Sequence, residues 1–165
     1  MKNLMVIFTL FSALCFGQQD SPKGDRGINP LYILDGMIAN EPQIKSITTA
    51  QIAAISIYKS DNLPKNLEVF SNFANEGIID IILKDKEDHL VSISFEKLNV
   101  TNNLNELNPI YINNILVKGT TVQILEDAIL DTEIIEKNGK KFLNIWTVAK
   151  DQRNGIAKMM TGKKI

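Results

Sequence analysis

The run Ile78–Leu83 constrains the fold most strongly, because five of its six side chains are isoleucine or leucine. A run of this length is typical of a β-strand covered on both faces, whereas a strand with one solvent face alternates apolar and polar residues. We therefore expect residues 78–83 to form a central strand, with the other segments of the chain packed around it.

Two earlier runs also predict strands. Leu31–Leu34 is rich in β-formers and ends at Asp35 followed by glycine, a pair that supplies the positive φ of a tight turn. Ile52–Lys59 places Ile55 and Ile57 between small or polar neighbours, a pattern that predicts a strand with these two isoleucines facing a core.

Helix signals lie between these strands. Thr48 and Gln51 have the spacing of a capping box, which predicts that a short helix begins there. A second helix is predicted over Pro64–Asn75, because proline suits a first helical turn and apolar residues recur at helical spacing before Gly77. These apolar residues are Leu67, Phe70, Phe73 and Ala74.

Two β-hairpins are expected in the remaining chain. The charged stretch Lys84–His89 predicts a solvated turn, and the alternating Leu90–Phe95 predicts a strand that returns from it. Asn138 and Gly139 stand between two β-rich segments, which is the strongest short signal for a hairpin. Trp146, in the closing strand, is predicted to pack in the core.

The second half of the chain repeats two short motifs of the first. Asn108–Asn113 resembles Asn29–Leu34 at an offset of 79 positions, and Thr120–Ile124 resembles Thr48–Ile52 at an offset of 72. The same order of motifs indicates an internal duplication with a shorter loop in the second copy. Chance similarity between short motifs is the alternative.

Three segments, taken in order, resemble the plug domain of TonB-dependent outer-membrane receptors, in particular the carbohydrate-uptake branch. The similarity extends over residues 29–84 and comprises a Pro-Leu-Tyr-x-x-Asp-Gly motif, an Ile-x-x-Ile-x-x-x-Lys strand and a Gly-x-Ile-x-Ile-x-x-Lys strand. The matching residues are Pro30, Leu31, Tyr32, Asp35 and Gly36, then Ile52, Ile55 and Lys59, then Gly77, Ile79, Ile81 and Lys84.

The chain also departs from that family. Leu67–Ser71 stands where plugs have an alanine-rich segment ending in Tyr-Gly, and a barrel of about 22 strands needs over about 200 residues in strands alone. The resemblance therefore implies a plug-like unit without a barrel, acting as a secreted, non-enzymatic binding module of the bacterial cell envelope. An accessory component of an outer-membrane TonB-dependent transport system is the alternative.

The expected fold class is α+β, with small mixed sheets, short helices and plug-like β-α-β units that are duplicated if the repeat is genuine. Lys2 followed by a short apolar run has the layout of a secretory signal cleaved near Gly17, which implies a periplasmic or secreted protein that does not itself span the membrane. The expected divisions are a signal peptide (1–17), a flexible lead-in (18–28), a plug-like unit (29–98), a second α+β unit packed on the first (99–150) and a tail (151–165).

Composition excludes several function classes. Eighteen basic and 19 acidic side chains nearly cancel, so no nucleic-acid partner is expected. Cys15 lies in the signal segment and His89 in a charged turn, so no catalytic residue, cofactor or metal site is expected. The carboxylates nearest apolar strands, Asp35, Asp80 and Glu96, leave a small carboxylate-dependent hydrolase as a further alternative. Their structural interpretation is stronger, with Asp35 capping a turn and Asp80 at an edge or against a basic partner.

The expected partner is an envelope protein or outer-membrane component. Small mixed sheets leave unpaired backbone groups at their edges, so contact through a strand edge or a hairpin is the preferred mechanism. Tyr32 and Tyr111 take equivalent places in the two repeated motifs, and with Asp35 they are the candidate interaction residues.

Overall fold

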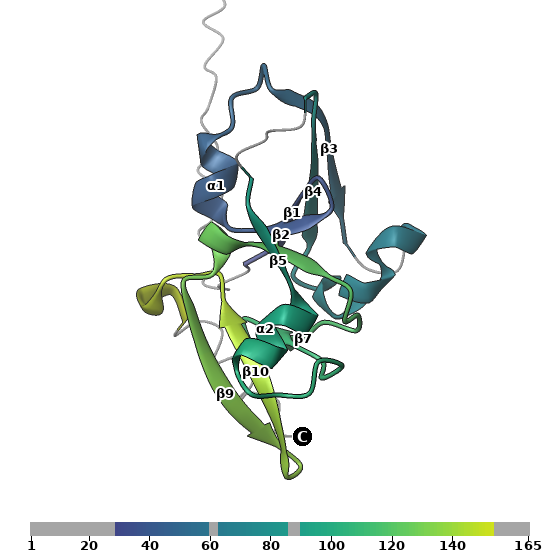
Figure 1. The fold of residues 1–165 in the computed structure, drawn as a ribbon. Helices are drawn as coiled ribbons and strands as arrows, with labels where there is room; N and C mark the ends of the chain where they lie inside the picture. The colour runs from purple at the N-terminus through teal and green to yellow at the C-terminus, as the bar shows by residue number, and fades with distance from the viewer. Residues whose placement is uncertain (1–28, 60–62, 86–89, 154–165) are drawn as a thin grey trace, which may run out of the picture.

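A computed structural model describes residues 29–59, 63–85 and 90–153. The predicted signal segment, the lead-in, most of the tail and His89 lie outside the described residues. The described chain forms two mixed β-sheets with short helices around them, which confirms the α+β class (Figure 1).

The first sheet has six strands and contains the three plug-like segments of the sequence, all of which are strands as predicted. In spatial order they are β3 (Ile52–Tyr58), β4 (Ile78–Leu83), β1 (Leu31–Leu34), β2 (Met37–Ala39), β8 (Gln123–Leu125) and β5 (Ser92–Ser94). β1 forms an antiparallel hairpin with β2 and a parallel pair with β4, and β3 lies antiparallel to β4. The central position predicted for residues 78–83 is therefore confirmed.

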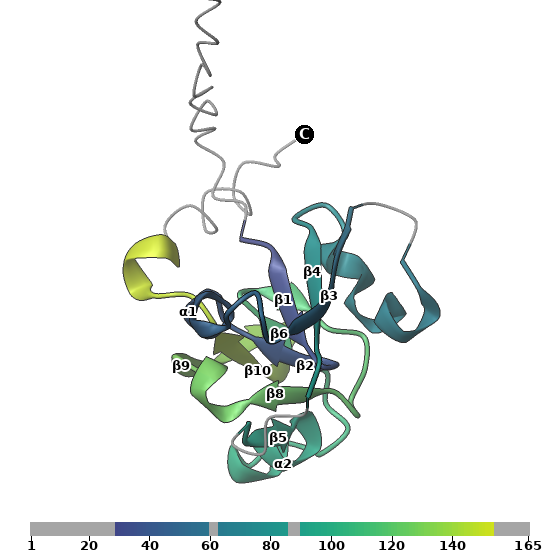
Figure 2. The same cartoon turned by 90° about the horizontal axis from the view of Figure 1, so that it is seen from above.

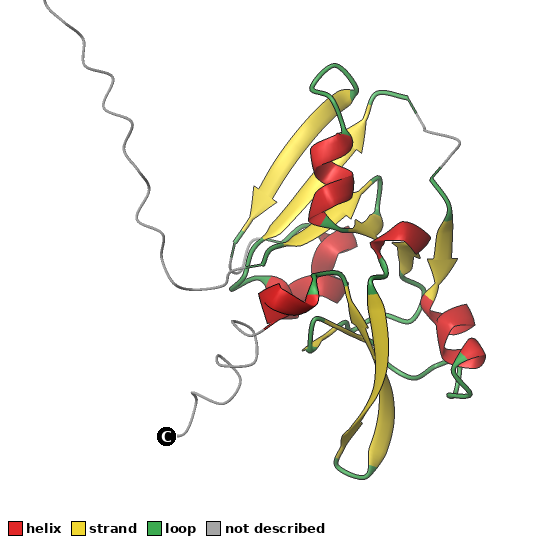
Figure 3. Cartoon of the chain, turned by 90° about the vertical axis from the view of Figure 1, so that its left-hand side faces the viewer, coloured by secondary structure: helices red, strands yellow, loops and turns green. Residues whose placement is uncertain are grey.

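The second sheet has four strands from the C-terminal part. In spatial order they are β7 (Ile115–Leu116), β6 (Tyr111–Ile112), β10 (Lys140–Trp146) and β9 (Asp131–Lys137). The predicted hairpin at Asn138 and Gly139 is confirmed, since both residues have positive φ and join β9 to β10. Figure 3 shows this long hairpin projecting from the rest of the molecule.

The two sheets share one connection pattern. In each, a two-strand hairpin (β1–β2 or β6–β7) places its first strand parallel to a longer strand (β4 or β10), whose other side pairs with an antiparallel strand (β3 or β9). β8 has no counterpart in this pattern. It comes from the second half of the chain, yet it pairs with β2 in the first sheet.

Matching hydrogen bonds give the alignment of the two hairpins. The Asp35 backbone N–H donates to Ile81 O at 2.9 Å, and an Asp35 carboxylate oxygen accepts the Leu83 N–H at 3.0 Å. Asn113 repeats both contacts, donating to Ile145 O at 2.9 Å and accepting the Thr147 N–H at 2.9 Å. Asp35 therefore corresponds to Asn113, and the two turns are built in the same way.

The second repeated motif does not have a common structure. Thr48–Ile52 forms a turn that leads into β3, whereas Thr120–Ile124 leads into β8. The prediction that a helix begins at Thr48 is wrong, because Ile52 already pairs with Leu83. The Gln51 side chain does accept the Thr48 N–H, at 2.8 Å, but it does so within a turn. The spacing of Thr48 and Gln51 suits a turn as well as a helix start, and strand pairing with β4 decides in favour of the turn.

The helix of this region lies earlier, as α1 (Glu41–Ser46). Asn40 caps it, since its side-chain oxygen accepts the Gln43 N–H at 2.9 Å and its backbone N–H donates to the Gln43 side chain at 3.0 Å. This reciprocal arrangement is a capping box, formed eight residues before the one that the sequence suggested.

The second predicted helix is present as η1 (Lys65–Phe73), in the 3₁₀ form. Its three buried side chains, Leu67, Phe70 and Phe73, occur at every third residue. A 3₁₀-helix has three residues per turn, so this spacing places all three on one line facing the sheet. Gly77, with φ of 95°, then turns the chain into β4.

Leu90–Phe95 does not return against β4, so the predicted hairpin is wrong. β5 pairs with β8 at the far edge of the sheet, and Phe95 begins α2 (Phe95–Thr101) with Ser94 as its cap. Figure 2 shows β5 and α2 at the end of the molecule away from β3. The physical reason is that β1 and β3 already occupy both sides of β4.

One hydrophobic core includes residues of both sheets. It contains Ile81 of the central strand and Ile145 of the second sheet. Trp146 is buried as predicted, with 6% exposure, but lies outside this cluster, with the Arg153 guanidinium 4.5 Å from its ring centroid. Ile82 is 49% exposed, so β4 is not covered on both faces along its whole length. Two short 3₁₀ turns complete the described chain, η2 (Glu126–Ala128) and η3 (Lys150–Gln152).

Candidate protein-interaction edge

β3 is one of the two edge strands of the first sheet, and two of its large side chains face solvent, whereas Ile52 and Tyr58 pack partly against the core. Ile55 is 55% exposed and Ile57 is 65% exposed. The prediction that these isoleucines face a core is therefore wrong, although their partners on β4, Ile81 and Ile79, are buried and half-buried. Alternation along the strand shows that the two isoleucines share a face of the sheet. It does not show that the core ends before β3, which leaves this face open to solvent.

β3 carries no charged side chain over its seven residues, Ile-Ala-Ala-Ile-Ser-Ile-Tyr. β9 occupies the corresponding place at the edge of the second sheet and has the sequence Asp-Thr-Glu-Ile-Ile-Glu-Lys. Charged side chains on an edge strand oppose the addition of another strand. Of these two corresponding edges, only β3 lacks that protection, and we refer to Ile52–Tyr58 as the β3 edge.

A β-bulge limits the regular part of this edge. The register between β3 and β4 shifts between Ile52 and Ala54, after which Ala54 to Tyr58 pair one by one with β4. A bulge disrupts the ladder locally and increases strand twist. Residues 54–58 are therefore the regular length over which another strand can be added.

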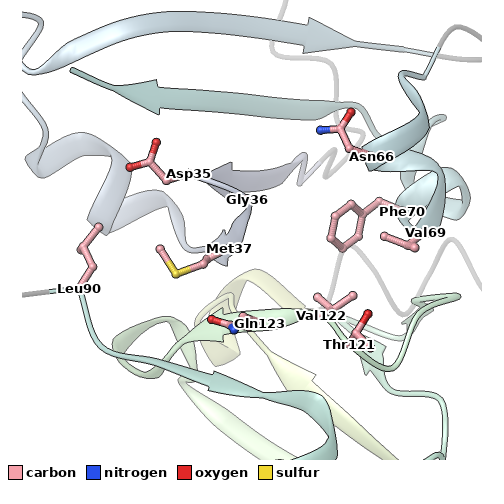
Figure 4. A pocket seen from close by; sticks show the side chains of 10 residues that line it. All are labelled: Asp35, Gly36, Met37, Asn66, Val69, Phe70, Leu90, Thr121, Val122 and Gln123. Atoms are coloured by element: carbon pink, nitrogen blue, oxygen red, sulfur yellow. The ribbon is translucent and has the colours of Figure 1, made fainter. Parts of the chain in front are cut away.

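A groove surrounds the tip of the β1–β2 turn. It has two adjoining parts of about 630 and 680 Å³, which share Asp35, Gly36, Asn66 and Phe70. Figure 4 shows the first part, between η1 on one side and Thr121 to Gln123 on the other. Asp80 lines the second part, so the structure brings together two of the three carboxylates singled out in the sequence. Glu96 lies in the first turn of α2.

Asp80 is not at a sheet edge and is not paired with a basic side chain of the described residues, contrary to prediction. It lies in the central strand β4. The nearby Lys84 has a different partner, because its ammonium N–H donates a hydrogen bond to Ala50 O at 2.7 Å. Burial raises the pKa of Asp80, and the nearby Asp35 carboxylate raises it further. Ionised Asp80 is therefore disfavoured in the folded protein relative to the unfolded chain.

Replacing Asp80 with asparagine is expected to raise the free energy of unfolding at pH 7. Because the folded-state pKa is raised, wild-type stability falls as pH rises through it, and a neutral side chain avoids this loss. The gain should shrink as the pH falls below the ordinary aspartate range, where Asp80 is protonated in both states. Asn144 occupies the matching position on β10, fully buried, so an amide fits such a site.

Urea unfolding at pH 3 and pH 7 measures this difference. Asp85→Asn is the control, because Asp85 is an exposed carboxylate just beyond the same strand. A loss of stability in Asp80→Asn at pH 7 would show that the carboxylate makes a favourable contact in the folded state.

The candidate tyrosines are not at equivalent positions. The correspondence of Asp35 with Asn113 is an offset of 78, so Tyr111 corresponds to Ile33 and Tyr32 to Ile110. A shift of one residue in a strand moves a side chain to the other face of the sheet. Tyr32 and Tyr111 therefore lie on opposite faces of their hairpins.

Each tyrosine already has intramolecular contacts. Burial raises the pKa of Tyr32, with a further rise from Glu41. The Tyr111 ring meets Phe142 edge to face at a centroid distance of 5.6 Å, and the Lys137 ammonium lies 3.8 Å from the Tyr111 ring centroid. The structure thus keeps Tyr32 and Asp35 on one hairpin and Tyr111 on the other sheet, and it does not form a joint site from the three.

Within the described ranges, no three His, Cys, Asp or Glu side chains are grouped to hold a metal ion, and no helix is long and apolar enough to cross a membrane. Comparison with protein-family models, with curated proteins and with solved structures found no match to this chain.

Proposed function

We propose that this protein is a secreted, non-enzymatic binding module of the bacterial cell envelope that pairs with another polypeptide chain at the β3 edge. The observation that carries the proposal is the exposed, uncharged β3 edge, with Ile55 and Ile57 open to solvent at the margin of a six-stranded sheet. The partner is an envelope protein or outer-membrane component, and no cofactor is required.

Strand addition suits this surface physically. An edge strand has backbone N–H and C=O groups on its outer side, and an added strand satisfies them with regular hydrogen bonds. The added strand also covers Ile55 and Ile57, and burial of apolar surface contributes about 25 cal/mol per Å². Backbone pairing provides affinity, while the exposed isoleucines favour apolar residues on one face of the partner strand.

A role as an accessory component of a TonB-dependent transport system is the second candidate. It is favoured by the arrangement of the three plug-like segments, which form neighbouring strands β3, β4 and β1 of one sheet. The hydrolase alternative is less favoured, because one oxygen of Asp35 accepts the Leu83 N–H and so serves the turn. If Asp35→Asn abolished a measurable hydrolysis, the non-enzymatic proposal would fail.

The proposal predicts that capture of an envelope partner depends on the β3 edge. Ile57→Lys adds a charge within the regular pairing length of residues 54–58 and is expected to reduce capture from envelope extracts by at least about tenfold. Ile134→Lys is the matched control, because Ile134 is 46% exposed and occupies the corresponding position on β9. Equal capture by both variants would rule out the β3 edge.

A further inference from the structure

We infer that the partner strand at the β3 edge is β3 of a second copy of this chain, paired antiparallel about a two-fold axis at Ser56. The inference rests on the proposed function and names the partner of the same site. It would join two six-stranded sheets into one continuous sheet.

The register follows from the bulge. Regular pairing is limited to residues 54–58, and the only two-fold register that uses all five places Ser56 opposite its own copy. Residue numbers of opposing positions then sum to 112. Two strands related by a two-fold axis perpendicular to the sheet run antiparallel, which is the orientation that this register requires.

Side-chain sizes are complementary in this register. Ile55 of each copy lies opposite Ile57 of the other, so four exposed isoleucines form one cluster on one face. Ala54 lies opposite Tyr58, which places a large ring beside a small side chain. Directly opposed side chains of an antiparallel pair lie close enough to pack, so this register buries the isoleucines against one another without a steric clash at Tyr58.

The charge pattern also permits self-pairing. No ionised side chain lies within residues 54–58, and Lys59 falls opposite Ala53, so like charges do not meet directly. β9, by contrast, has four ionisable side chains in seven positions, and its Glu133 already accepts the Trp146 indole N–H and an Asn144 amide proton. A second copy is therefore expected to use β3 and not β9.

Mass and mutation test the dimer. Sedimentation equilibrium of the wild-type chain at micromolar concentration is expected to give twice the monomer mass. Ile57→Lys should raise the dimer dissociation constant by at least about tenfold, while Ile134→Lys leaves it unchanged. Circular dichroism establishes that both variants are folded. A folded wild-type monomer, or a dimer equally sensitive to both substitutions, overturns the inference.

Disulfide trapping tests the register. In a chain carrying Cys15→Ser, which removes the only native thiol, Ser56→Cys is expected to cross-link two copies under mild oxidation. Directly opposed Cβ atoms lie about 4.5–5.5 Å apart, close enough for a disulfide after small adjustments. Ala54→Cys is the control, since its two copies lie four positions apart along the strand. Faster cross-linking at residue 54 than at residue 56 overturns the register.

The two proposals fail in different ways. If the wild-type chain is a monomer yet captures another envelope polypeptide in a manner lost in Ile57→Lys, the edge function stands and the second copy is excluded. If neither dimerisation nor capture depends on Ile57, both proposals are excluded.

Discussion

Replacing Phe95 with alanine is expected to lower the free energy of unfolding by about 3–5 kcal/mol. Phe95 is fully buried at the start of α2, and its backbone N–H donates to Val122 O at 3.0 Å beside β8. Truncation leaves a cavity where the two halves of the chain meet in one core, and backbone pairing on each side limits how far the cavity can collapse.

Urea unfolding followed by two signals measures this effect. Fluorescence of Trp146, the only tryptophan, reports on the second sheet, and far-UV circular dichroism reports on the whole chain. One core predicts that the two transitions coincide. Leu107→Ala is the control, because Leu107 is 64% exposed and should change stability by less than about 0.5 kcal/mol. Separate transitions, or a loss below about 1 kcal/mol for Phe95→Ala, would contradict the single core.

Replacing Asn113 with alanine is expected to cost about 2–4 kcal/mol of unfolding free energy. Asn113 is 7% exposed with φ of 51°, and its amide donates to the Thr147 hydroxyl at 2.8 Å while its oxygen accepts the Thr147 N–H. Alanine removes both bonds, leaves a buried donor unpaired and is strained at positive φ. Thermal and urea unfolding of the variant measure the loss.

Asn113→Asp separates the two contributions. It retains the oxygen that accepts the Thr147 N–H, as Asp35 does for Leu83, but removes the donor to the Thr147 hydroxyl. Its loss should therefore be smaller than that of Asn113→Ala. The reciprocal change, Asp35→Asn, retains the acceptor of the first turn and is expected to be tolerated. Equal losses for Asn113→Asp and Asn113→Ala would refute the turn-anchoring role of the acceptor oxygen.

Local patterns in the sequence predicted strands and tight turns well. The apolar run at Ile78–Leu83 and the turn pairs at Asp35 and Asn138 depend on residue preferences within a few positions, and all three are found in the structure. The stripe in η1 was also identified, although its spacing of three suits a 3₁₀-helix as well as an α-helix. Such features depend on neighbours in sequence, so they can be read without tertiary contacts.

Pairing between distant segments was not predicted. Leu90–Phe95 alternates in the way that many strands do, and the pattern does not state whether β4 or β8 is its neighbour. The sequence of Gln123–Leu125 likewise does not indicate whether this strand belongs to the first sheet or to the second. Of the candidate interaction residues, Tyr111 was misaligned with Tyr32 by one position, which only the turn hydrogen bonds reveal.

The sequence by itself determined where the chain extends and where it turns, because side-chain shape, glycine and asparagine at positive φ, and apolar periodicity act over a few residues. The order of strands, and therefore which strand lies at an edge, was decided only by the tertiary structure. Ile55 and Ile57 have the same local pattern as core residues, and they face solvent because no described strand lies outside β3. The exposure of a strand depends on the order of all strands in the sheet, so the β3 edge could be recognised as a binding surface only from the tertiary structure.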